Sequence, residues 1–173
     1  MALSHPTLMA TPLPFQLGRA DLQRADVQAL IRHHQAAALA ANKICEGHAL
    51  GIQDYVDQTA EGALTLYEAR DDHDLLGLCG LYRLSETVGE LKTMHTRGPA
   101  RGRGVGQALL SHVIAVAQKR GLEQIKLETG TADFFAAATR LYARLGFEDC
   151  PPFADYEANP DSRFMQLKVK AVR

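Results

Sequence analysis

The sequence predicts a mixed α/β fold in which antiparallel strands precede a parallel strand–helix–strand crossover. Three apolar segments, at residues 63–70, 75–84 and 88–96, are joined by short polar turns, which favours antiparallel pairing of neighbouring strands. An amphipathic helix follows, with Val105, Leu109 and Val116 on one face, and leads to a strand at 124–129. A strand–helix–strand unit of this kind forms a right-handed crossover between parallel strands.

The remaining helices and strands are predicted from helix-capping residues, from glycine and proline breakers, and from the alternation of apolar and polar residues. Residues 1–13 are expected to form a flexible tail, and residues 14–173 a single domain. Gly77 and Gly80 are expected to mark bulges in their strand. The other expected elements are a strand at 15–18, a helix capped by Asp21 or Asp26 and ending near Lys43, a short helix at 53–58, a helix capped by Thr131 or Asp133 and ending at Gly146, and a strand at 164–169.

Composition narrows the function classes. The chain has 173 residues, of which 46% are hydrophobic and 23% charged, as in globular proteins with a real core. Its net charge of −1 gives no basic field, so a nucleic-acid partner is not expected. No apolar run is long enough to span a bilayer and no signal peptide is recognisable, so we expect a cytoplasmic protein without a membrane partner.

The cysteines and histidines do not predict a metal site. Cys45, Cys79 and Cys150 are odd in number and lack zinc-motif spacing, so they are expected to be reduced thiols. His33 and His34 are adjacent on a helix and face different ways, so they do not form an i, i+4 metal pair. We expect core or solvated roles for these histidines.

The loop Arg101–Gln107 carries the clearest chemical signal. Glycines without a Cβ let an anion approach the backbone, and the start of a helix offers unpaired N–H groups and a positive dipole end. Arg101 and Arg103 add bidentate phosphate donors. The loop therefore predicts a pyrophosphate site. It lacks the Gly-Lys-Ser/Thr triplet of a P-loop and the third small residue of the dinucleotide fingerprint.

The pattern that remains is Arg-x-x-Gly-x-Gly, at Arg101, Gly104 and Gly106. It resembles the acetyl-CoA loop of the GNAT superfamily of N-acetyltransferases, and its setting between a strand and a helix strengthens the likeness. The segment Leu141–Phe147 is similar to the family's Leu-Tyr-x-x-x-Gly-Phe, and Glu90 has the separation from Arg101 seen where the family uses a glutamate base.

The resemblance covers nearly the whole chain and implies helices on both faces of a mixed sheet. It also implies acetyl-CoA as acyl donor and a small-molecule or protein amine as acceptor. Residues 152–165 look like a subgroup of small acetyltransferases in which Gly usually stands at the position of Pro151 or Ala154. The implied acetyl-CoA contacts are Met94, His95, Thr96, Arg101, Gly102, Arg103, Gly104, Val105, Gly106, Gln107 and Thr129.

Two side chains are candidates for catalysis, each with a structural alternative. Glu90 could remove a proton from the amine, or it could pair with Lys92 on the same strand face. Tyr142 could give a proton or hydrogen bond to the departing thiolate, or it could be a half-buried helix tyrosine. A backbone N–H between Met94 and Thr96 could bind the oxyanion.

Besides an enzyme, two classes of non-catalytic protein are compatible with the sequence. One is a CoA-binding regulatory module, and the other is an interaction domain of the same fold that does not bind CoA. Asp155, Glu157 and Asp161 could attract a cationic amine, although a solvated loop explains them equally. A monomer and a homodimer are both compatible with the sequence.

Overall fold

The computed structural model describes residues 13–41 and 51–169. The expectations for the tail before Leu13, for a helix end near Lys43 and for Cys45 lie outside these residues. The described strands are β1 (Gln16–Arg19), β2 (Leu64–Arg70), β3 (Leu75–Arg83), β4 (Val88–Thr96), β5 (Gln124–Gly130), β6 (Glu148–Asp149) and β7 (Ser162–Lys168). The described helices are α1 (Ala25–Ala41), α2 (Ile52–Ala60), α3 (Val105–Lys119) and α4 (Ala136–Arg144), with 3-10 turns at Gly98–Ala100 and Asp133–Phe135.

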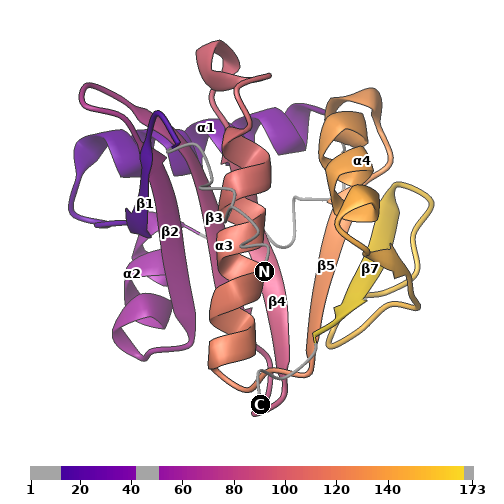
Figure 1. Ribbon diagram of the computed structural model, residues 1–173. Coiled ribbons are helices and arrows are strands. Elements are labelled where there is room, and N and C mark those ends of the chain that lie inside the picture. The colour runs from indigo at the N-terminus through magenta and orange to yellow at the C-terminus, as the bar shows by residue number, and fades with distance from the viewer. Residues whose placement is uncertain (1–12, 42–50, 170–173) are drawn as a thin grey trace, which may run out of the picture.

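The described strands form one sheet in the order β1-β2-β3-β4-β5-β7-β6. Neighbouring strands are antiparallel except β4 and β5, which are parallel and are joined through α3. The predicted fold class is therefore confirmed. The two parallel strands pair only along Val88–Glu90, and Figure 1 shows them diverging beyond that point.

Helices cover both faces of the sheet, and each face has its own core (Figure 1). On one face, α3 buries Leu109, Leu110 and Val113 completely against the sheet, and α4 packs beside it. On the other face, Val27 and Ile31 of α1 pack with the residues of α2. None of the described helices is long and apolar enough to cross a membrane.

The sheet has two irregularities, and they lie beside the glycines that the sequence singled out. Between β2 and β3 the register shifts next to Gly77. Between β3 and β4, Leu78 faces His95 but Gly80 already faces Lys92, so the extra residue belongs to β4. A Cβ at Gly77 would lie 2.7 Å from the His95 carbonyl oxygen, and one at Gly80 would lie 3.0 Å from the Lys92 carbonyl oxygen. These glycines let the bulged β4 approach closely.

The predicted start of the helix before Gly146 was wrong. Neither Thr131 nor Asp133 caps it, because residues 133–135 form a separate 3-10 turn and α4 begins at Ala136. The Thr131 hydroxyl donates instead to the Pro160 carbonyl. In α4 and at its C-cap, Ala138, Leu141 and Leu145 are half-buried and pack against the core, and Tyr142 is the buried residue.

The predicted cap of the first long helix was wrong as well. Helix α1 begins at Ala25, one residue before Asp26. The Asp26 carboxylate accepts the Val27 N–H inside the first turn and pairs with Arg24 and Arg70. The Asp21 carboxylate accepts the Gln23 N–H in the preceding turn. Acidic side chains in the first helical turn favour the helix without being its N-cap.

Candidate functional site

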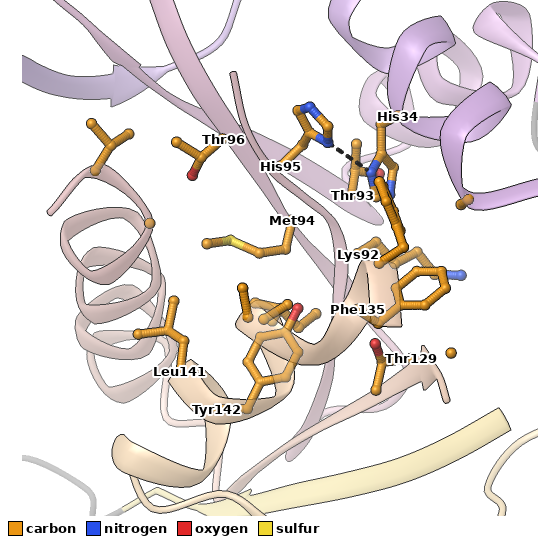
Figure 2. A pocket seen from close by; sticks show the side chains of 18 of the residues that line it. His34, Lys92, Thr93, Met94, His95, Thr96, Thr129, Phe135, Leu141 and Tyr142 are labelled. Atoms are coloured by element: carbon orange, nitrogen blue, oxygen red, sulfur yellow. Dashed lines mark hydrogen bonds between the residues drawn. The ribbon is translucent and has the colours of Figure 1, made fainter. Parts of the chain in front are cut away.

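A cavity of about 660 Å³ opens where β4 and β5 diverge. Its walls come from α1, α2, β4, β5, α3, α4 and the loops that follow β4 and β6 (Figure 2). Of the residues that the sequence singled out, those that line it are Glu90, Met94, His95, Thr96, Arg101, Gly102, Gly104, Val105, Gly106, Gln107, Thr129 and Tyr142. Arg103 does not line the cavity.

The bulge in β4 shapes this cavity. Thr93 has a φ of 53°, which is rare for a β-branched residue. The Tyr55 hydroxyl, from α2, lies 2.6 Å from the Thr93 hydroxyl and holds it in place. The extra residue puts Lys92 and Thr93 on the face covered by α1 and α2, where Lys92 pairs with Glu90. Met94 then packs with the core of the opposite face.

The start of α3 forms an open, backbone-lined cradle at one end of the cavity. Gly104 is the N-cap of α3 with a φ of 79°, and Gly102 has a φ of 76°. A Cβ on either would meet nothing within 4 Å. A Cβ on Gly106 would lie 3.2 Å from the Thr96 hydroxyl, so this glycine lets the helix start pack against the end of β4. The predicted helix start is confirmed.

Three arginines surround the cradle in different ways. The Arg101 Nε donates to the Thr96 carbonyl over 3.3 Å, which holds the loop to the end of β4. The Arg103 guanidinium lies 3.7 Å from the Asp71 carboxylate, outside the cavity. Arg144 of α4, which sequence reasoning missed, lines the cavity and donates to the Gln107 side chain over 3.4 Å. Its place in the last turn of α4 carried no signal of this.

Glu90 is the last residue of β4 that pairs with β5, and its side chain is buried, with 3% of the residue exposed. The Lys92 ammonium lies 3.3 Å from its Oε1 atom, so the pairing named as the alternative role of Glu90 is present. The Tyr156 hydroxyl donates to the same oxygen over 2.6 Å. Sequence reasoning missed Tyr156, because the contact spans 66 residues and depends on where the loop before β7 folds back.

Tyr142 lies on the α4 side of the cavity, across from Met94 of β4 (Figure 2). It is 5% exposed, and its ring packs against Phe147 at a centroid distance of 5.8 Å. Burial raises the pKa of Tyr142 far above that of a free phenol, and the nearby Cys79 and Glu128 add to the shift. The phenol therefore stays protonated at neutral pH and is a hydrogen-bond donor.

A pair of histidines lines the α1 side of the cavity. His34 Nδ1 lies 3.2 Å from His95 Nδ1, so one ring donates and the other accepts. His33 packs edge-on against His95. Desolvation lowers the pKa of His34 to about 4, and desolvation with the charges of His34, His33 and Arg101 lowers the pKa of His95 to about 4. Both rings are thus neutral at pH 7. Among the described residues, the buried His95 Nε2 has no hydrogen-bond partner.

The two described cysteines are free thiols, Cys79 in the core and Cys150 half-buried. Desolvation raises the pKa of both, so they stay protonated at neutral pH. Among the residues that the structure describes, no three His, Cys, Asp or Glu side chains are grouped so as to hold a metal ion.

Comparison with known proteins gives one family. Residues 27–147 match the Acetyltransferase (GNAT) family. The chain is 38% identical over 155 residues to an uncharacterised N-acetyltransferase of Escherichia coli, YedL, covering 90% of this chain and 95% of the relative. It is 34% identical over 149 residues to an uncharacterised N-acetyltransferase of Bacillus subtilis, YsnE, covering 86% of this chain and 96% of that relative.

Solved structures share the fold over nearly the full length. An acetyltransferase of the GNAT family from Staphylococcus aureus superposes with a TM-score of 0.72 at 20% identity, covering 90% of this chain and 99% of that one. A GNAT family acetyltransferase from Elizabethkingia anophelis with acetyl-CoA bound superposes with a TM-score of 0.63 at 18% identity, covering 90% of this chain and 98% of that one.

The histidine pair predicts a specific loss of stability in mild acid. Unfolded histidine binds a proton below about pH 6.5, whereas folded His34 stays neutral down to about pH 4. The free energy of unfolding should therefore fall as the pH drops through this window. In His34→Gln the fall should be shallower by up to about 1.4 kcal/mol per pH unit, measured by urea unfolding between pH 7 and pH 5.

His73→Gln is the matched control, since His73 is exposed in the turn between β2 and β3. It should show the wild-type pH dependence. Equal slopes for wild type and His34→Gln would mean that His34 is not held neutral by the fold.

Proposed function

The chain belongs to the Acetyltransferase (GNAT) family, and from this premise we propose that it moves an acetyl group from acetyl-CoA to a primary amine by direct attack in a ternary complex. The observation that carries the proposal is the single cavity that joins the glycine cradle of α3 to the carboxylate of Glu90. Acetyl-CoA supplies an activated acyl group as a thioester. A catalytically silent module would not need both Glu90 and Tyr142 in that cavity, so the enzyme is favoured.

The cradle fits a pyrophosphate. The N–H groups at the start of α3 are free of side-chain caps, because Gly104 is the N-cap and makes no such bond. The open space beside Gly102 and Gly104 allows phosphate oxygens to approach them, and the helix dipole favours their charge. Arg101 and Arg144 line the same end and can add charge-assisted hydrogen bonds. We assign Gly102 to Gln107 to this contact, with Arg103 at its periphery.

The diverging strands fit the rest of the acetyl-CoA molecule. Beyond Glu90, β4 no longer pairs with β5, so its backbone groups face the cavity along Leu91–Thr96. An extended ligand with amide groups can hydrogen-bond to such an edge as an added strand does. Met94 and Thr96 on one side and Thr129 on the other would then flank the acyl chain.

Glu90 is our candidate for the general base. Most primary amines are protonated at pH 7, so a base must take a proton before the nitrogen can attack. Glu90 lies where β4 and β5 separate, and its carboxylate faces the α1 and α2 side of the cavity with Lys92. This supports entry of the amine from the side lined by His34, Gln35 and Tyr55, opposite the cradle.

Two further groups would act on the charges that develop during attack. A backbone N–H within Met94–Thr96 can donate to the carbonyl oxygen as it becomes negative. The Tyr142 hydroxyl can donate to the departing sulfur. Because burial raises the pKa of Tyr142 well above the pKa of a thiol, a hydrogen bond to the thiolate is favoured over complete proton transfer.

We also propose a cytoplasmic location, which is where acetyl-CoA would be available as donor. The free thiols of Cys79 and Cys150 suit a reducing compartment.

Glu90→Gln tests the base assignment. The amide keeps the size of the side chain but cannot take a proton, so kcat should fall by about 10²-fold while acetyl-CoA affinity stays near that of the wild type. Raising the pH should restore part of the rate, because more of the amine is already neutral. The measurement is thiol release from acetyl-CoA over a panel of primary amines. Glu86→Gln, in the exposed turn before β4, is the control. Wild-type turnover and pH dependence in Glu90→Gln would show that Glu90 is not the base and has a structural role.

Tyr142→Phe tests the hydroxyl. The ring stays packed against Phe147, so the fold and acetyl-CoA affinity should be kept. Turnover should fall by about 10²-fold if the hydroxyl stabilises the leaving group. The loss should shrink for acetyl thioesters whose thiol is a better leaving group, measured by single-turnover kinetics so that chemistry limits the rate. An equal loss for all thioesters would argue against a contact with the sulfur.

A further inference from the structure

We propose that Tyr156 is a positioning residue for the reaction, whose hydroxyl holds the Glu90 carboxylate in the orientation that a base requires. The inference rests on the proposed function, in which Glu90 takes a proton from the amine. Tyr156 was assigned no role from the sequence, and its side chain reaches the site from the loop between β6 and β7.

The contact is short and lies at the reacting carboxylate. The Tyr156 hydroxyl donates to Glu90 Oε1 over 2.6 Å, and Lys92 Nζ lies 3.3 Å from the same oxygen. The carboxylate is buried, so these two donors replace the water that would otherwise solvate it. Both contacts engage Oε1, which leaves Oε2 as the oxygen that can accept a proton from the amine.

The Tyr156 ring is fixed by packing, so its hydroxyl is held at a defined point. The centroid of the Tyr156 ring lies 5.1 Å from that of Phe153 and 5.7 Å from that of Phe164 in β7. The centroids of the Phe153 and Phe164 rings lie 5.9 Å apart. Phe153 and Phe164 are both buried. The three aromatic rings anchor the loop to the sheet beside the cavity.

The turn that presents Tyr156 is tight. The Tyr156 N–H donates to the Phe153 carbonyl over 3.1 Å, and Ala154 between them has a φ of 48°. A non-glycine residue in this conformation is strained, so the surrounding packing must hold the turn. Backbone strain of this kind clusters at functional sites, and here it aims a hydroxyl at a carboxylate.

A hydrogen bond from the Tyr156 hydroxyl to one carboxylate oxygen fixes the rotation of the Glu90 side chain, and so fixes which oxygen faces the substrate. Removing the hydroxyl should therefore let the carboxylate rotate. Because Tyr156 acts through Glu90, its removal should have no effect once Glu90 cannot act as a base.

The experiment compares Tyr156→Phe, Glu90→Gln and the double variant by kcat/KM against pH, with acetyl-CoA affinity measured by calorimetry. Tyr156→Phe keeps the ring and its packing. We expect kcat/KM for the amine to fall by about tenfold across the profile, while acetyl-CoA affinity stays unchanged. The double variant should match Glu90→Gln.

Tyr82→Phe is the matched control. It removes a hydroxyl from the neighbouring strand β3, and its ring remains beneath the Lys92 ammonium. It should keep the wild-type profile. Wild-type turnover in Glu90→Gln would remove the base role, and the present inference with it. Impaired Glu90→Gln beside a wild-type profile for Tyr156→Phe would overturn this inference alone. A double variant clearly slower than Glu90→Gln would show that Tyr156 acts directly and not through Glu90.

Discussion

The bulge at Thr93 is the constraint on which the site depends. A β-branched residue at φ 53° is unfavourable by itself, and the short contact between its hydroxyl and that of Tyr55 helps to hold it. The bulge moves one extra residue of β4 onto the face of α1 and α2, and it lies in the segment where β4 and β5 separate after Glu90. Without that separation there would be no cavity between the strands, because a regular parallel pair would fill the space with its own hydrogen bonds.

The two faces of the sheet divide the chemistry between them. The face of α3 and α4 holds the glycine cradle and Tyr142, so it suits an anionic ligand and its leaving group. The face of α1 and α2 holds Glu90, Lys92 and the neutral histidine pair, so it suits an amine that must lose a proton. The opening between β4 and β5 connects the two, and two substrates can meet there from opposite sides.

The sequence predicted the antiparallel strands before the crossover, the parallel crossover and the start of α3, because local spacing and glycine positions determine them. Strand alternation also indicated the Glu90–Lys92 pair, as one of two alternatives for Glu90. It could not predict Tyr156 or Arg144 in the site, because their positions depend on how distant segments fold back. The helix starts at Ala25 and Ala136 were misjudged, because Asp26 lies within the first turn of α1 and Asp133 lies in a separate 3-10 turn before α4.

Binding of acetyl-CoA at the start of α3 can be tested by calorimetric titration of acetyl-CoA into the Gly104→Val variant. A valine there would fill the open cradle, so we expect binding to weaken by about tenfold or more. Gly62→Val is the matched control, because Gly62 has a similar φ of 75° and equally open surroundings but lies in the turn after α2. It should suffer the same backbone strain and bind acetyl-CoA as the wild type does. A folded Gly104→Val protein that binds acetyl-CoA with wild-type affinity would show that the start of α3 is not the acetyl-CoA site.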